Sequence, residues 1–138
     1  MELLLVEDDL EDAGLTIEAL KQGQVRCRVS LVRDGEEALE FLHREGRYAR
    51  APRPDVMLLD MNLPKKDGRE VLAEMKTDPG LGGIPVVVLT ASRTHQEILA
   101  EQDLHVDSYL TKPVDLGEFV GVVKSLRKFL LADVILPQ

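Results

Sequence analysis

Short apolar runs alternate with stretches of helical periodicity from one end of the chain to the other. Apolar runs typical of strands buried on both faces of a parallel sheet occupy residues 3–6, 55–60 and 86–89. Strict apolar/polar alternation predicts a further strand over residues 25–31, and a brief strand is expected at about 108–110. Between them, apolar residues at helical spacing predict helices over residues 11–22, 34–45, 69–77, 95–102 and 115–130.

This alternation of strands and helices predicts an α/β fold of the (βα)₅ type. Right-handed crossovers leave doubly wound parallel sheets, and the flavodoxin-like strand order 2-1-3-4-5 suits five strands. The 138 residues leave room for one domain, which we expect over residues 1–130, followed by a short tail at 131–138 and no output domain. Ligands of such a sheet bind beyond the carboxyl ends of the strands, where the first and third strands are neighbours.

Composition narrows the possible partners. The chain carries 25 acidic and 17 basic residues, a net charge of −8, which argues against a nucleic-acid partner because such binding needs clustered lysine and arginine. No apolar run approaches the ~20 residues of a membrane helix and there is no basic leader, so we expect a cytoplasmic protein with no membrane contact. The single cysteine, Cys27, excludes an internal disulfide and is expected to be buried and unreactive.

Acidic residues gather where the first and third strands are predicted to end. Glu7, Asp8 and Asp9 follow the first strand, and Asp60 ends the third. We expect Asp9 to cap the next helix. The other three carboxylates should then lie within a few ångströms, where a pair at 4 Å repels by about 4 kcal/mol. Such a cluster needs a proton or a divalent cation, and its oxygen donors favour Mg²⁺, with Mn²⁺ or Ca²⁺ as alternatives, over zinc.

A hydroxyl and an ammonium group are expected at the same edge of the sheet. Thr90 ends the fourth strand and Lys112 follows the fifth. One interpretation makes Lys112 a structural ion-pair partner of Asp60. The other is that cation, metal and hydroxyl together stabilise a transferring phosphoryl group. The motifs GxxxxGK[ST], GxGxxG and GxSxG are absent, which argues against nucleotide hydrolysis, dinucleotide chemistry and acyl transfer.

Four separated motifs carry a family resemblance. From residue 2 to about residue 130 the chain resembles a response-regulator receiver domain of two-component signalling, in Leu5-Val6-Glu7-Asp8-Asp9, Leu58-Leu59-Asp60-Met61-Asn62-Leu63-Pro64 with Asp67-Gly68, Val88-Leu89-Thr90-Ala91 and Tyr109-Leu110-Thr111-Lys112-Pro113. The resemblance implies a phosphoprotein that takes a phosphoryl group from a histidine kinase and signals through protein contacts. It implies that the protein is not an enzyme and that its only reactions are self-phosphorylation and slow self-dephosphorylation.

The resemblance implies a role for each residue of the acidic site. Asp60 matches the phosphoacceptor. Glu7 and Asp8 match the acidic pair that holds Mg²⁺, for which Mn²⁺ could substitute, and Asn62 matches the position whose main-chain carbonyl is a further metal ligand. Glu7 stands where many members have Asp.

The same resemblance implies the residues that respond to phosphorylation. Thr90 and Lys112 match the switch hydroxyl and the phosphoryl-binding lysine, and Tyr109 matches the aromatic residue whose ring changes rotamer. Asn62 and Ser92, two residues beyond Asp60 and Thr90, are expected to flank the path of the hydrolytic water and tune its rate.

A finer resemblance is to small single-domain receivers paired with phytochrome-type histidine kinases. It rests on the extended loop at residues 44–54 and on segments 63–68 and 109–115. It implies a cognate sensor histidine kinase or phosphotransfer protein as partner, in light sensing or another phosphorelay. The apolar tail predicts a homodimer through the fourth helix, fifth strand and fifth helix, unless residues 134–136 fold back on their own domain. Two rival classes are a Mg²⁺-dependent phosphohydrolase and a flavin-binding module of the same fold.

Overall fold

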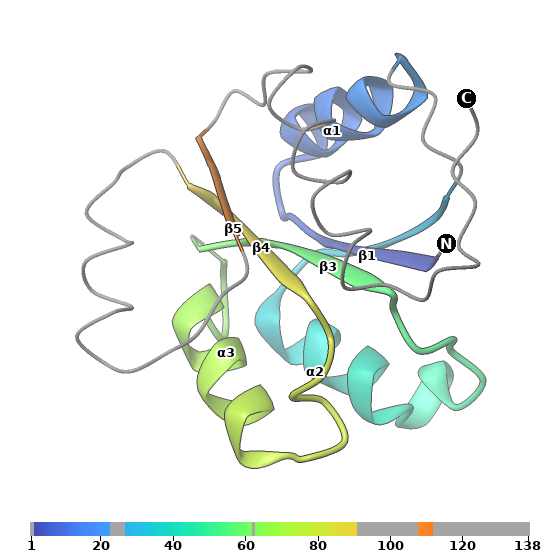
Figure 1. Cartoon of the computed structure of the whole chain (residues 1–138), viewed down its shortest axis with the longest axis vertical. Coiled ribbons are helices and arrows are strands. Elements are labelled where there is room, and N and C mark those ends of the chain that lie inside the picture. Colours follow the sequence, from blue (N-terminus) through green and yellow to red (C-terminus); the bar gives the residue numbers. More distant parts are fainter. Residues whose placement is uncertain (1, 23–26, 62, 91–107, 112–138) are drawn as a thin grey trace.

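Strands and helices alternate over the described residues up to residue 90, as the sequence predicts (Figure 1). The computed structural model describes residues 2–22, 27–61, 63–90 and 108–111. The elements are β1 (Glu2–Val6), α1 (Leu10–Gln22), β2 (Arg28–Val32), α2 (Gly35–His43), the 3₁₀ turn η1 (Gly46–Tyr48), β3 (Val56–Asp60), α3 (Gly68–Thr77), β4 (Val86–Thr90) and β5 (Ser108–Thr111). Within this described part, no helix is long and apolar enough to cross a membrane. The helices predicted over 95–102 and 115–130 and the tail at 131–138 lie outside the described residues.

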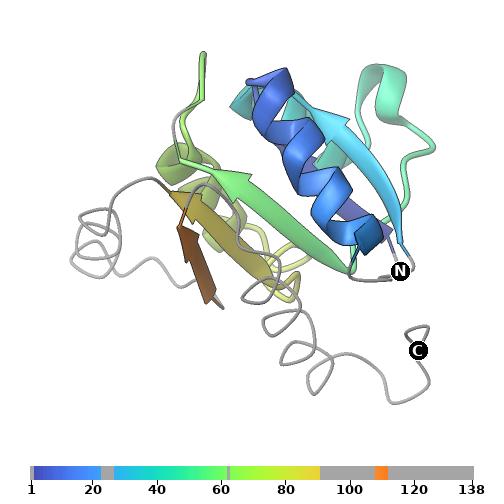
Figure 2. The same cartoon turned by 90° about the horizontal axis from the view of Figure 1, so that it is seen from above.

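The strands form one sheet whose order is β2-β1-β3-β4-β5. Every neighbouring pair is parallel, so the predicted doubly wound, flavodoxin-like topology is confirmed. Because the strands are parallel, their carboxyl ends share one edge, toward which the arrowheads in Figure 2 point. α1 crosses one face of the sheet, and α2 and α3 cover the other (Figure 1).

Apolar side chains cover both faces of the sheet, which explains why the inner strands are apolar without alternation. In β1, Leu4 and Val6 pack with the residues of α2 and α3, whereas Leu3 and Leu5 pack with those of α1. β3 and β4 divide their side chains between the same two clusters. Each such buried side chain contributes about 1.5–3 kcal/mol, so the strand ends that carry the site rest on a rigid core.

β2 lies at the edge of the sheet and is less buried than the inner strands. It runs from Arg28 to Val32 rather than over the predicted 25–31, and residues 23–26 are outside the description. Cys27, directly before β2, is half-buried rather than fully buried and packs against the cluster under α1. Burial raises the pKa of its thiol, which lowers the thiolate fraction and supports the prediction of an unreactive cysteine.

α2 begins where predicted and ends earlier. Oδ1 of Asp34 accepts a hydrogen bond from the N–H of Glu37 at 2.7 Å, which caps the helix. The Glu37 carboxylate accepts a hydrogen bond from the Tyr48 hydroxyl at 2.8 Å, and this bond anchors η1 within the predicted loop at residues 44–54. The helix ends at His43, and not at about residue 45, because Arg44 adopts the left-handed conformation.

Candidate functional site

The carboxyl ends of β1 and β3 bring three acidic side chains together. Val6 pairs with Leu59 in the parallel register, so Glu7 and Asp60 stand beside each other one residue further along. Glu7, Asp8 and Asp60 each offer a carboxylate oxygen, and these oxygens all lie within 4.8 Å of one another. The structure therefore places these three residues together, as the strand order predicts.

Backbone hydrogen bonds hold the acidic residues at the end of β1. The N–H of Glu7 donates to the carbonyl of Val32 at 3.0 Å, which extends the pairing of β1 with β2 past the last strand residue. The Arg33 guanidinium donates to the main-chain carbonyl of Asp8 at 2.9 Å. Glu7 is thus held by the pairing of β1 with β2, and Asp8 by the side chain that follows β2, which favours a fixed geometry.

Asp9, the third acidic residue after β1, caps α1 as predicted. Its Oδ1 accepts hydrogen bonds from the N–H groups of Glu11 at 2.9 Å and Asp12 at 3.2 Å. A carboxylate in this position satisfies unpaired donors of the first helical turn and interacts favourably with the helix dipole. The capping bonds explain why three of the acidic residues cluster and Asp9 does not join them.

Burial strengthens the mutual repulsion of the clustered carboxylates. Glu7 is 0% exposed and Asp60 is 4% exposed, whereas Asp8 is half-buried. Carboxylates at 4 Å repel by about 4 kcal/mol per pair at an intermediate dielectric. The oxygen atoms of this set are hard donors, without histidine or cysteine, and such sets suit Mg²⁺ or Mn²⁺ rather than zinc. The donor set of this structure therefore fits a divalent cation.

The backbone after Asp60 is packed closely against the start of α3. The N–H of Gly68 donates to the carbonyl of Met61 at 3.1 Å, and a Cβ on Gly68 would stand 2.8 Å from the carbonyl oxygen of Asp60. Asp67 caps this helix, since its Oδ1 accepts a hydrogen bond from the N–H of Glu70 at 2.9 Å. Only a glycine permits this approach without a shift of backbone.

The same loop also touches the start of α2. A Cβ on Gly35 would lie 2.0 Å from the carbonyl oxygen of Lys66. Lys65 adopts a positive φ of 65°, and its ammonium pairs with Oδ2 of the capping residue Asp34 at 3.6 Å. Sequence reasoning missed this contact between the loop and α2. The available signal was glycine, a poor helix former, at the first position of the helix.

The other predicted site residues fall at or beyond the ends of the remaining strands. Asp60 pairs with Leu89, and Thr90 pairs with Thr111, so the backbone of Thr90 reaches the edge that carries the carboxylates. Tyr109 pairs with Val88 inside the sheet; only strand positions are described for Thr90 and Tyr109. Three further predicted residues lie outside the described part of the chain: Asn62, Ser92 and Lys112.

A comparison with protein families decides the class of this site. Residues 3–124 match the family model of the response regulator receiver domain. The chain belongs to the response-regulator receiver family. Phosphoryl acceptance is general to this family, whose members are in the main not enzymes. Membership favours a phosphorylation-dependent regulator over the phosphohydrolase and the flavin-binding module that the residues alone left as rivals.

The receiver is similar over nearly its whole length to regulators of phytochrome signalling. It is 47% identical over 135 residues to response regulator Rcp1 of Synechocystis sp.. The aligned residues cover 98% of this chain and 92% of Rcp1. The Mn²⁺-bound structure of Rcp1 covers 99% of both chains with a TM-score of 0.76 and 46% identity. The phosphorylated cyanobacterial phytochrome response regulator RcpA covers 99% of this chain and 98% of its own, with a TM-score of 0.77 and 50% identity.

A third solved structure, the bacteriophytochrome response regulator RtBRR, extends the likeness to another group of phytochromes. It covers 99% of this chain and 83% of its own, with a TM-score of 0.87 and 38% identity. The predicted resemblance to small receivers paired with phytochrome-type kinases is therefore confirmed.

Proposed function

We propose that this protein is a single-domain response regulator that accepts a phosphoryl group from a histidine kinase on Asp60. The observation that carries the proposal is the cluster of Glu7, Asp8 and Asp60, whose carboxylate oxygens lie within 4.8 Å of one another at the carboxyl edge of the sheet. These residues, with the carbonyl of Asn62, would hold Mg²⁺ or Mn²⁺, which when bound offsets negative charge on phosphoryl oxygens. The Mn²⁺-bound structure of Rcp1 supports the metal assignment.

The proposed transfer uses the Asp60 carboxylate as nucleophile. One of its oxygens attacks the phosphorus of a phosphohistidine; the P–O bond forms as the P–N bond breaks, and the imidazole leaves with the electron pair and takes up a proton. Lys112 offsets the developing charge, and Thr90 donates a hydrogen bond to a phosphoryl oxygen. The acyl phosphate is later hydrolysed by an in-line water whose path Asn62 and Ser92 flank.

The proposed signal is a shift between two packings of the domain. Phosphorylation adds about −1.5 to −2 charges and three acceptor oxygens at the carboxyl edge. Thr90 and the loop after it move toward the phosphoryl group, and the ring of Tyr109 enters the space that they leave. The shift matters to a partner that binds the two packings differently. We place the readout on the face formed by β5 and the helices predicted over 95–102 and 115–130.

The same face is our proposed homodimer interface. Residues 129–131 and 134–136 are all apolar, which is a large apolar content for so short a segment. A closed two-fold dimer buries the same patch on both subunits. Deletion of residues 132–138 should weaken association without abolishing phosphorylation of Asp60. Light scattering that reports a monomer at tens of micromolar, with and without acetyl phosphate, would exclude the dimer.

The phosphodonor is a sensor histidine kinase or phosphotransfer protein, which we place against α1. This helix begins three residues after Glu7, and it presents Leu10 at 58% exposure and Leu15 at 59% exposure. Leu10 adjoins the acidic site in sequence and Leu15 lies further along the helix, and both offer a donor protein apolar contact area as it approaches the site. The likeness to RcpA and RtBRR supports a phytochrome-type kinase as the donor.

Acetyl phosphate tests the phosphoacceptor directly. With Mg²⁺, the wild-type chain should gain a single phosphoryl group, seen by intact mass, whereas Asp60→Asn should fold and gain none. Asp67→Asn is the matched control, because residue 67 caps α3 from the loop after Asp60 and asparagine caps equally well. Label that persists on Asp60→Asn would overturn the assignment, and release of phosphate over many turnovers would identify a phosphohydrolase instead.

A further inference from the structure

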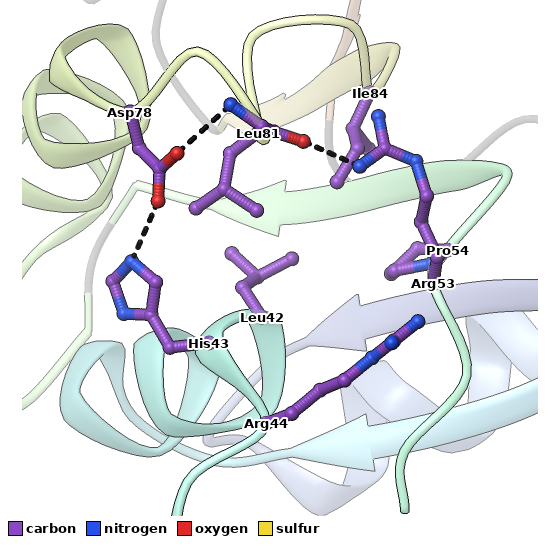
Figure 3. Close-up of a pocket in the computed structure, with 9 residues that line it drawn as sticks. Leu42, His43, Arg44, Arg53, Pro54, Asp78, Leu81 and Ile84 are labelled. Atoms are coloured by element: carbon purple, nitrogen blue, oxygen red, sulfur yellow. Dashed lines mark hydrogen bonds and ion pairs between the residues drawn. The ribbon is translucent and has the colours of Figure 1, made fainter.

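A cavity of about 390 Å³ lies at the amino edge of the sheet, where β3 and β4 begin (Figure 3). Its floor is apolar and is made by Leu42, Leu81 and Ile84, all at most 8% exposed. Pro54, two residues before β3, closes one side. A five-residue strand separates this edge from Asp60, a distance of roughly 16 Å at ~3.3 Å per residue. The cavity is therefore a different place from the phosphorylation site.

Charged side chains surround the apolar floor. Figure 3 shows the His43–Asp78 pair across the cavity from Arg53. Asp78 is engaged at both oxygens: Oδ2 lies 3.3 Å from Nε2 of His43, and Oδ1 accepts a hydrogen bond from the N–H of Gly80 at 2.8 Å. The Arg53 guanidinium donates to the carbonyl of Gly80. Arg44, also at the rim, makes no ion pair or side-chain hydrogen bond with any residue that the structure describes.

The backbone of Arg44 gives an independent reason to examine its side chain. Arg44 ends α2 with φ 57° and ψ 45°, in the position where helices usually place glycine. Its N–H and that of Glu45 satisfy the carbonyls of Phe41 and Glu40, as such helix ends require. Left-handed backbone in a residue other than glycine is strained, and strain of this kind concentrates at functional positions. A glycine would serve the helix end better, so the guanidinium needs another explanation.

The charge of the surrounding segment points to an anionic ligand. Residues 44–53 contain four arginines and one glutamate, in a chain whose net charge is −8. Arg47 is used elsewhere, since it pairs with Glu37 at 3.1 Å and lies over the ring of Tyr48 at 5.0 Å. Arg44 and Arg53 are the two that line the cavity. Guanidinium groups recognise carboxylate and phosphate oxygens through paired hydrogen bonds.

We propose that this cavity binds a small organic anion that carries one carboxylate or phosphate-ester group on a compact apolar body. The anionic group lies against Arg44 and Arg53, and the apolar body rests on the floor of Leu42, Leu81 and Ile84. The volume falls in the range of about 300–1,000 Å³ that small-molecule sites occupy. Asp78, on the far side, repels a second negative charge, which favours a ligand with a single anionic group. This site is independent of the proposed phosphorylation of Asp60.

Amide NMR titration of the full chain tests the proposal. Benzoate or phenyl phosphate should shift the amides of residues 42–44 and 80–84 saturably, with Kd on the order of millimolar or tighter. The two probes distinguish a carboxylate from a phosphate ligand. Acetate, which lacks the apolar body, and benzamide, which lacks the charge, should each bind at least ~10-fold more weakly, a difference of about 1.4 kcal/mol. Absence of saturable shifts, or equal shifts with acetate and benzoate, would overturn the proposal. Binding of a hexaglutamate peptide but of neither small probe would also overturn it, because that result would mark a protein-docking surface.

Arg44→Gly separates the role of the side chain from folding. It removes the guanidinium and relieves the left-handed backbone, so affinity should fall at least ~10-fold while the melting temperature stays equal or rises. Arg50→Ala is the matched control, because Arg50 is exposed in the same segment, does not line the cavity and carries the same charge. Both variants should accept phosphate from acetyl phosphate as the wild type does. If Arg50→Ala weakened binding as much as Arg44→Gly, the anion would be attracted by net charge and the cavity site would be refuted.

Discussion

Gly35 lies against the main-chain carbonyl of Lys66 so closely that a Cβ at position 35 would stand 2.0 Å from its oxygen. The contact joins the first turn of α2 to the loop that follows Asp60. Gly35→Ala must displace the loop or the helix, and overpacking of this kind costs about 2 kcal/mol in the free energy of unfolding. We also expect slower labelling by acetyl phosphate, because this loop directly follows the proposed phosphoacceptor Asp60. Denaturant unfolding and timed mass spectrometry measure the two effects.

Gly14→Ala supplies the control for that substitution. Gly14 is exposed in α1, and a Cβ built on it has nothing within 4 Å. Alanine is the better helix former by about 0.5–1 kcal/mol, so this variant should be more stable than the wild type and label at the same rate. Equal stability of the two alanine variants would contradict a close backbone approach at Gly35.

Replacement of one buried carboxylate should separate charge repulsion from metal binding. Glu7→Gln keeps the size of the side chain and removes one of three clustered charges. Without divalent cations we expect a higher melting temperature than in the wild type, since repulsion is relieved. With Mg²⁺ at 100 times its Kd the wild type should gain about 2.7 kcal/mol, and Glu7→Gln should lose most of that gain. Thermal unfolding in EDTA and in Mg²⁺, at equal ionic strength, reports both changes.

Asp9→Asn tests whether the smaller Mg²⁺-dependent stabilisation of Glu7→Gln reflects the loss of a metal ligand. Asparagine caps helices as well as aspartate, so α1 should keep its cap while one charge beside the cluster disappears. The Mg²⁺-dependent rise in melting temperature should remain. If Asp9→Asn lost as much of the rise as Glu7→Gln, the metal would be responding to long-range charge and not to the three clustered carboxylates.

The acidic cluster could be predicted because it depends on topology alone. Unbroken apolar strands and intervening helices imply a doubly wound sheet, and in that sheet the residues after β1 and at the end of β3 must be neighbours. No distance had to be known for Glu7 and Asp60 to be paired. The Asp9 cap was predictable for a similar reason, since it involves residues close together in sequence.

Contacts between distant segments could not be predicted in this way. The packing of Gly35 on Lys66 depends on how a loop crosses a helix end, which leaves no periodic signal in either segment. The Glu37 carboxylate binds the hydroxyl of Tyr48 from the loop after α2, because Tyr48 packs on Phe41 with ring centroids 5.2 Å apart. Arg44 ends α2 in the left-handed conformation, which arginine rarely adopts. A helix end is predicted from residues that favour this conformation, above all glycine, so this one left no signal in the sequence.

Leu15 should matter for transfer from a protein donor and not for transfer from a small one. It is 59% exposed on α1, so Leu15→Glu costs little burial and keeps a good helix former. We expect phosphotransfer from a cognate kinase to slow at least ~10-fold, about 1.4 kcal/mol, with labelling by acetyl phosphate unchanged. Lys21→Glu places a new acid in the last turn of the same helix and should leave kinase transfer near the wild-type rate. Equal slowing by both variants would point to general charge repulsion.

Asp34 performs two tasks whose contributions can be measured separately. Its Oδ1 caps α2, and its Oδ2 pairs with Lys65, whose side chain is 60% exposed. Asp34→Ala removes both and should lower the free energy of unfolding by about 1–2 kcal/mol, most of it from the lost cap. Asp34→Asn keeps the cap and should cost only ~0.5 kcal/mol, since exposed ion pairs contribute little. If urea unfolding showed a large decrease in the free energy of unfolding of Asp34→Asn, the ion pair and not the cap would be what holds the loop.

Tyr48 should make the stability of the loop at residues 44–54 sensitive to alkaline pH. Burial and the hydrogen bond to the Glu37 carboxylate raise the pKa of its hydroxyl above the ordinary value of 10.0. A group with a raised pKa holds its proton more tightly when folded, so its contribution is complete below about pH 10 and is lost as pH rises past that value. Tyr48→Phe keeps the ring on Phe41 and should cost about 1 kcal/mol at neutral pH. The difference from wild type should shrink above pH 10 in urea unfolding, and a difference that stayed constant to higher pH would show that the hydroxyl bond does not stabilise the loop.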